Sequence, residues 1–98
     1  MDEKQKEAEY RAAVHNFYDI YRPLQKKYNL RMHAQFSIYD DGLIEIWEYN
    51  GEAKGRCILK VQEEKDIDCY KRAAEYLKSY EKSEKEREKQ WQHGIKAG

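Results

Sequence analysis

The residues of this chain that could carry chemistry are its three histidines, its two cysteines and its numerous carboxylates. His15, His33 and His93 lie far apart, without the His-x-x-x-His spacing that brings two imidazoles to one face of a helix for a metal ion. Cys57 and Cys69 lack the Cys-x-x-Cys spacing of metal and redox sites. The sequence therefore predicts no metal site and no cofactor.

Groups suited to catalysis are equally scattered. A cysteine nucleophile needs a base within hydrogen-bond reach, and the strand pattern described below turns Cys57 toward the core. Asp40 and Asp41 are adjacent, but Asp-Asp-Gly is a typical turn sequence. Gly51 and Gly55 flank a hairpin tip, whereas the glycines of a phosphate-binding loop lead into a helix. We therefore expect a protein that is not an enzyme and takes no small-molecule substrate.

The composition limits the classes of partner. The chain has 98 residues, enough for one domain, and 39% of them are charged, in equal numbers of each sign. Nucleic-acid-binding proteins are commonly basic and DNA mimics acidic, so a net charge of zero favours neither class. No apolar run approaches the length of a membrane span or of a signal-peptide core. We expect a cytoplasmic protein with reduced cysteines and no membrane partner.

The middle third of the chain predicts three short strands. Along the first strand, apolar residues alternate with polar ones, as in a strand with one buried face: Met32, Ala34, Phe36 and Ile38. A three-residue loop with Gly42 in the left-handed conformation would pair Ile38 with Ile44 and Phe36 with Ile46. This register matches apolar residues with one another, whereas a slip of one residue would turn every side chain to the other face.

The second hairpin is predicted to close over residues 51–54. A four-residue loop there pairs Ile46 with Leu59 and continues the apolar face. On the other face, the same register makes three pairs: Glu45 with Lys60, Trp47 with Ile58, and Tyr49 with Arg56. Opposite charges and aromatic–aliphatic pairs each stabilise neighbouring strands by about 0.2–1 kcal/mol. The register also allows the Arg56 guanidinium to lie against the Tyr49 ring.

A long helix is predicted on the N-terminal side of the strands, over residues 2–28. Its apolar residues recur at spacings of four and three and form one stripe: Tyr10, Val14, Phe17, Tyr21, Leu24 and Tyr28. Pro23 removes one backbone donor and restricts Arg22, which predicts a kink or break followed by a short second helical piece. Asn29 is the predicted stop.

A second long helix is predicted to begin at Asp66, whose carboxylate can cap the first turn. Its buried stripe is formed by Ile67, Tyr70, Ala74 and Leu77, with Ala73 and Tyr80 beside it. From Glu81 the sequence is mostly charged and predicts a solvated helix projecting beyond the core. These elements predict a two-layer α+β fold, with one α-β-β-β-α domain at residues 1–80 and a projecting charged extension at residues 81–98.

The order helix, three strands, helix resembles that of a double-stranded-RNA-binding domain. That family needs a basic cluster at the start of its last helix to contact phosphates, whereas residues 63–68 here are mostly acidic, so this resemblance is one of topology only. The whole chain also resembles small phage-encoded inhibitors of bacterial defence, including some anti-CRISPR proteins, in being short, tyrosine-rich and highly charged, with a short meander between helices. This second resemblance implies a stoichiometric, protein-binding inhibitor.

The sheet face away from the helices gathers the residues that we predict to bind a partner: Tyr39, Leu43, Trp47, Tyr49, Arg56, Ile58 and Lys60. An exposed apolar patch of this kind usually marks an interaction site, and aromatic residues and Arg contribute most of the energy there. We expect a secondary contact at Trp91, within the projecting helix.

The residues of this patch do not identify what covers it. The chain's own C-terminal helix could cover it, or a second copy in a homodimer, or a different protein. The alternative function is binding of single-stranded nucleic acid, with bases stacked on Trp47 and Tyr49 and phosphates at Arg56 and Lys60.

Overall fold

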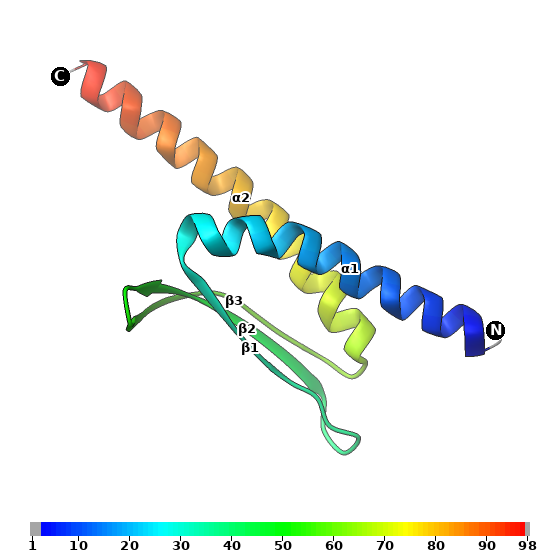
Figure 1. The fold of residues 1–98 in the computed structure, drawn as a ribbon. Helices are drawn as coiled ribbons and strands as arrows, with labels where there is room; N and C mark the ends of the chain where they lie inside the picture. The colour runs from blue at the N-terminus through cyan, green and yellow to red at the C-terminus, as the bar shows by residue number, and fades with distance from the viewer. Residues whose placement is uncertain (1–2, 98) are drawn as a thin grey trace.

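Two helices cover one face of a three-stranded antiparallel sheet in the computed structural model, which describes residues 3–97 and the side chains of residues 3–88 (Figure 1). The elements follow in the order α1 (Glu3–Tyr28), β1 (Leu30–Gln35), β2 (Gly42–Asn50), β3 (Ala53–Glu63) and α2 (Asp66–Ala97). The strands lie side by side in chain order, so β2 is central and β1 and β3 are the edges. This confirms the predicted α+β fold and its order of elements.

The predicted apolar stripe of α1 is its buried face from Phe17 onward, where Phe17, Tyr21 and Leu24 are at most 3% exposed, whereas Tyr10 at the start of the stripe is 37% exposed. The helix runs through Pro23 without interruption, so the predicted second helical piece is wrong. A proline inside a helix costs about 3 kcal/mol, and burial of Leu24 alone contributes about 1.5–3 kcal/mol in the opposite direction. Asn29 follows the last helical residue with a φ of 53°, the left-handed conformation that commonly ends helices.

The core lies between the sheet and the two helices. It is formed by Ala13, Phe17, Tyr21, Leu24, Leu30, Ile44, Ile46, Leu59, Val61, Cys69, Tyr70, Ala73, Ala74 and Leu77. The Phe17 ring is central to it, with its centroid 5.5 Å from the centroids of both Tyr21 and Tyr70. The predicted stripe of the second helix is therefore confirmed, and it packs directly on that of α1. Cys57 and Cys69 are both free thiols.

The first hairpin is wider than predicted. β1 ends at Gln35, and residues 36–41 form the connection to β2. Met32, rather than Phe36, lies opposite Ile46, so the register differs from the predicted one by four residues. Because four is an even number, each side chain of β1 still faces the predicted side of the sheet.

Gly42 explains the path of this connection. Its φ is not positive, so the predicted left-handed turn is wrong. Gly42 is instead buried, and a Cβ atom there would lie 2.8 Å from Cδ1 of Phe36 and 3.0 Å from Sγ of Cys69. Phe36 thus packs over Gly42 and beside Tyr70, with 5.5 Å between the two ring centroids. The chain leaves the sheet as a result, and Ile38, predicted to face the core, is 90% exposed.

The second hairpin keeps the predicted pairing of Ile46 with Leu59 and then departs from it. The turn has two residues, Gly51 and Glu52, instead of the predicted four, and Gly51 takes a left-handed φ of 64°. The two residues that the shorter turn leaves over are accommodated within β3, where the register shifts twice by one residue. These shifts place Trp47 opposite Cys57 and Tyr49 opposite Lys54.

α2 extends well beyond the sheet that it covers, and its C-terminal part projects from the body (Figure 1). The principal extents are 61 × 27 × 19 Å. Contacts between α2 and the body continue as far as Glu88, whose carboxylate lies 3.8 Å from Nζ of Lys27. None of the helices in the described part of the chain is both long enough and apolar enough to cross a bilayer.

We expect Gly42→Ala to lower the free energy of unfolding by about 1–3 kcal/mol, because the new methyl group would overlap the Phe36 ring. Urea unfolding measures this change. Most of the cost should disappear in a Phe36→Ala background, where the ring is gone. An equal cost in both backgrounds would contradict the contact.

Stability should also fall at alkaline pH. Burial raises the pKa of Tyr21 and of Tyr70 to about 12, whereas an unfolded tyrosine titrates near about 10. The unfolded state therefore loses protons first, so this contribution is complete below about pH 10 and is lost as the pH rises toward 12. Urea midpoints measured between pH 8 and 12 test this, and Tyr21→Phe should flatten the decline. A midpoint that stays constant to pH 12 would contradict it.

Candidate functional site

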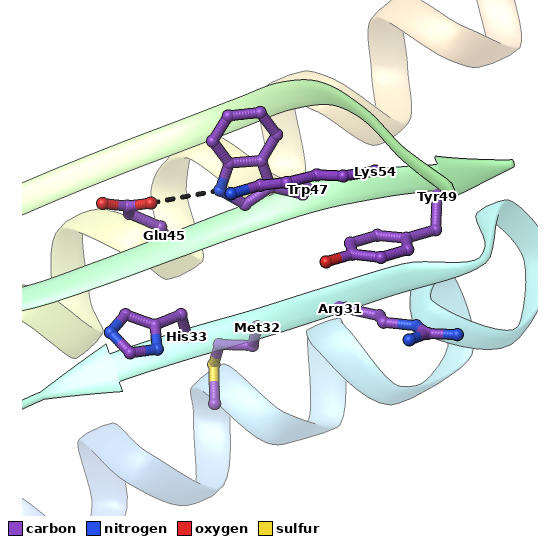
Figure 2. Close-up of a pocket in the computed structure, with 7 residues that line it drawn as sticks. All are labelled: Arg31, Met32, His33, Glu45, Trp47, Tyr49 and Lys54. Atoms are coloured by element: carbon purple, nitrogen blue, oxygen red, sulfur yellow. Dashed lines mark hydrogen bonds between the residues drawn. The ribbon is translucent and has the colours of Figure 1, made fainter. Parts of the chain in front are cut away.

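The sheet face away from the helices, which we call the open face, carries the candidate site. A shallow hollow of about 390 Å³ lies on it and is lined by Arg31, Met32, His33, Glu45, Trp47, Tyr49 and Lys54 (Figure 2). The strand register brings these residues together, because Arg31 lies opposite Trp47 and His33 lies opposite Glu45. Alternate residues of a strand share one face, so all three strands contribute to one surface.

Trp47 is held in position by two neighbours. Its indole Nε1 donates a hydrogen bond of 3.1 Å to Oε2 of Glu45, and Nζ of Lys54 lies 3.9 Å from the centre of its ring system. A cation over an indole contributes about 0.5–1 kcal/mol at an exposed site. The half-buried indole is therefore oriented before any partner arrives, which lowers the entropy cost of binding.

Tyr49 has a similar arrangement with a different cation. Cζ of Arg31 lies 4.3 Å from the Tyr49 ring centroid, and the Arg31 guanidinium also lies 3.4 Å from a carboxylate oxygen of Glu52. The predicted contact between Tyr49 and Arg56 is wrong, because the cation comes from β1 and not from β3.

The charges of the open face are unevenly compensated. Lys60 lies 4.0 Å from the Glu45 carboxylate, which is also bonded to the indole. The carboxylate beside Arg31 belongs to Glu52, which is 94% exposed, and so exposed a pair contributes little. Among the described residues, Lys54 has a ring contact but no ion pair. With three cations, Arg31, Lys54 and Lys60, beside two carboxylates, Glu45 and Glu52, the open face carries a small excess of positive charge.

Four of the seven predicted partner-binding residues lie on the open face, and Tyr39 is exposed in a neighbouring loop. Trp47 and Tyr49 line the hollow. Lys60 is opposite Glu45, and Leu43 is half-buried at the start of β2, two positions before Glu45. Tyr39 lies outside the sheet, in the connection between β1 and β2, and is 87% exposed.

Arg56 and Ile58 do not lie on the open face, contrary to the prediction. Ile58 packs against the core cluster, and Arg56 reaches across to α2. The two register shifts in β3 are the cause, because an extra residue in one strand turns the residues that follow it to the opposite face.

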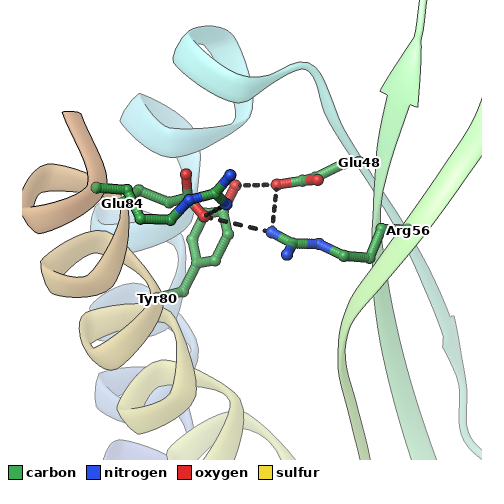
Figure 3. A network of polar contacts seen from close by, with 5 residues as sticks. Glu48, Arg56, Tyr80 and Glu84 are labelled. Carbon is green, nitrogen blue, oxygen red and sulfur yellow. Dashed lines mark hydrogen bonds and ion pairs between the residues drawn. The ribbon is translucent and has the colours of Figure 1, made fainter. Parts of the chain in front are cut away.

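Arg56 belongs to a polar network between the sheet and α2 (Figure 3). Its Nη2 donates to Oε2 of Glu48 at 3.0 Å and to Oε1 of Glu84 at 3.3 Å. The Tyr80 hydroxyl donates to the same Glu48 oxygen at 2.6 Å. Burial, together with this hydrogen bond, raises the pKa of Tyr80, so the hydroxyl remains a donor. The network attaches α2 to β2 and β3, which is a structural role.

Arg31 and Lys54 are the residues of the site that the sequence reasoning missed. The predicted register ran four residues away from the observed one and moved Arg31 away from Trp47. Lys54 was assigned to the second loop. A two-residue turn that begins with glycine is a common hairpin type, and choosing it at Gly51 would have placed Lys54 in β3.

The predicted contact at Trp91 lies outside the described side chains. Among the side chains that the structure describes, no three histidine, cysteine, aspartate or glutamate residues are placed to hold a metal ion. Comparison of the chain with protein-family models, with curated proteins and with solved structures found no match. The geometry of the open face is therefore the basis on which we infer a function.

Two neighbouring substitutions distinguish the faces of β2. Ile46 is fully buried, so Ile46→Ala should lower the free energy of unfolding by about 2–5 kcal/mol. Trp47→Ala should cost less, about 1–2 kcal/mol, because it removes one cation–π contact and one part-buried hydrogen bond. Urea unfolding of both variants measures the difference, and the reverse order of costs would mean that the proposed site is part of the core.

Proposed function

We propose that this protein is a non-enzymatic protein-binding module that contacts its partner through the open face. The observation that carries this proposal is the position of Trp47 and Tyr49 on a sheet face that neither helix covers, each oriented by a cation. Buried aromatic anchors contribute most of the energy of protein interfaces. Both residues belong to the central strand, which has a hydrogen-bonded neighbour on each side, so the anchors are presented on regular secondary structure.

The hollow between the anchors suits a protein side chain. Its apolar lining comes from Met32, Trp47 and Tyr49, and its polar lining comes from Arg31, His33, Glu45 and Lys54. An apolar side chain that carries a carboxylate, or lies next to one, would contact both the aromatic rings and the cations. This mixture of an apolar centre and a polar rim is typical of protein interfaces.

Protein is favoured over single-stranded nucleic acid by the contacts of the rings. Lys54 lies 3.9 Å from the centre of the Trp47 ring system and occupies the surface on which a base would stack.

The connection between β1 and β2 offers a second contact. Ile38 and Tyr39 are 90% and 87% exposed there, although both are large apolar residues. Exposed apolar residues on a loop are frequent in binding sites. We include this loop in the proposed interface.

The resemblance to small phage-encoded inhibitors supports a specific form of this function, the stoichiometric inhibition of a bacterial defence protein. A homodimer and a cytoplasmic location stay predictions, as does the secondary contact at Trp91.

Capture experiments with matched variants test the proposal. Immobilised wild type, Trp47→Ala and Tyr76→Ala are incubated with nuclease-treated bacterial lysate, and captured proteins are identified and purified for titration. Tyr76 is the control because it is an exposed aromatic residue on α2, on the helix side. Loss of a central anchor costs about 2 kcal/mol, so we expect Trp47→Ala to bind about 30-fold more weakly and Tyr76→Ala to bind like wild type.

Two results would contradict the proposal. One is equal capture by wild type and Trp47→Ala. The other is Trp47-dependent binding of an oligonucleotide of about 20 nucleotides with an affinity that falls steeply with salt, since phosphate contacts release counterions.

A further inference from the structure

The outer edge of β1 is a second feature of the sheet with backbone groups free to bind. Within the described part of the chain, β1 has a strand neighbour on one side only. The Tyr49 amide donates to the carbonyl oxygen of Asn29 at 3.0 Å, and hydrogen-bonded pairs alternate along an antiparallel ladder. Counting from this pair, Met32 and Ala34 direct their N–H and C=O groups away from β2. Ala34 is exposed and Met32 is half-buried.

The two edges of the sheet differ in protection. β3 has two register shifts, a close backbone contact at Gly55, and the lysines Lys54 and Lys60, which are features that discourage another strand from pairing. β1 pairs regularly from Leu30 to Gln35 and contains no lysine, proline or irregularity. The edge of β1 is therefore the one that can accept a further strand.

Hollows lie on both sides of this edge. One is the open-face hollow described above. The other has a volume of about 260 Å³ on the helix side and is lined by Tyr18, Tyr21, Arg22, Gln25 and Met32. Met32 lines both hollows. Because side chains alternate along a strand, a segment added at this edge would direct successive side chains into the two hollows.

Charge and the existing pairing indicate what that segment contains. β2 shows what β1 accepts, with Glu45 opposite His33 and Ile46 opposite Met32. The outward side chains of β1 on the open face include the exposed Arg31 and His33. A carboxylate opposite Arg31 is favourable and a cation there is unfavourable, while a carboxylate opposite His33 repeats the pairing that Glu45 already makes.

We propose that the edge of β1 binds an extended segment of the partner protein as a fourth strand, with acidic residues facing Arg31 and His33 and apolar residues facing Met32 and the helix-side hollow. This inference depends on the proposed function, for which it defines the chemistry of the partner. The backbone of the segment supplies affinity, and its alternating side chains supply specificity.

Synthetic peptides test the inference directly. The probe is a labelled peptide of about nine residues with glutamate and isoleucine at alternate positions, and the control peptide has lysine in place of each glutamate. We expect the lysine peptide to bind about tenfold more weakly in fluorescence anisotropy, because a favourable cross-strand charge pair with Arg31 becomes a repulsive one. Equal binding of the two peptides would overturn the inference.

A proline variant tests the backbone contribution. Ala34→Pro removes an N–H group that faces solvent, a place where an edge strand tolerates proline. We expect it to abolish binding of the glutamate peptide, whereas Ala34→Ser, which keeps the N–H group, binds like wild type. Hydrogen exchange of wild type gives a readout independent of folding: the amides of Met32 and Ala34 should exchange more slowly with the peptide bound. Unchanged exchange, or binding by a folded Ala34→Pro variant, would overturn the inference.

The remaining outcomes separate this inference from the proposed function. Self-association in sedimentation that Ala34→Pro removes would identify a second copy as the occupant and overturn the assignment of a partner segment. Partner capture that depends on Trp47 but is unaffected by Ala34→Pro would leave the proposed function standing and overturn the added strand. If the glutamate peptide binds at the edge but partner capture is unaffected by Trp47→Ala, the added strand stands and the proposed function is overturned.

Discussion

The two register shifts in β3 are the constraint on which both surfaces of the sheet depend. The second of them, between Trp47 and Tyr49, occurs where the backbone of Gly55 approaches Glu48 so closely that a Cβ atom would lie 2.7 Å from the Glu48 carbonyl oxygen. In a regular strand, Arg56 would lie beside Tyr49 on the open face. With the shifts, Lys54 takes the position opposite Tyr49, and Arg56 faces α2. One backbone feature therefore determines the cations on both sides.

The consequence on the helix side is a firm attachment of α2. Glu48 accepts hydrogen bonds from Arg56 and from Tyr80, and Glu84 lies within reach of the same guanidinium. The hydrogen bond from Tyr80 is part-buried and charge-assisted, so it contributes more than the exposed contacts of Arg56. Together with the aromatic contacts of Phe17, these hydrogen bonds keep both helices on one face of the sheet. The opposite face remains open for this reason.

The consequence on the open side is a surface that differs from the average of the chain. The whole protein has a net charge of zero, yet Arg31 and Lys54 lie against aromatic rings while the nearby carboxylate of Glu45 is already compensated by Lys60. The total charge of a protein describes its solubility and long-range attraction. The total charge does not describe the charges of one surface. These depend on which residues the strand register brings together.

The sequence alone determined the α+β class, the element order, the core stripes of both helices and the pairing of Ile46 with Leu59, because burial imposes a period that local sequence reveals. It also placed Trp47 and Tyr49 correctly on the sheet face away from the helices. The tertiary structure decided which cations meet them and where Ile38 lies. Those outcomes depend on contacts distant in sequence, such as Phe36 over Gly42 and Gly55 against Glu48. A period-two pattern is unchanged by an even slip in register and does not reveal a one-residue shift within a strand, so only the packed structure distinguishes these arrangements.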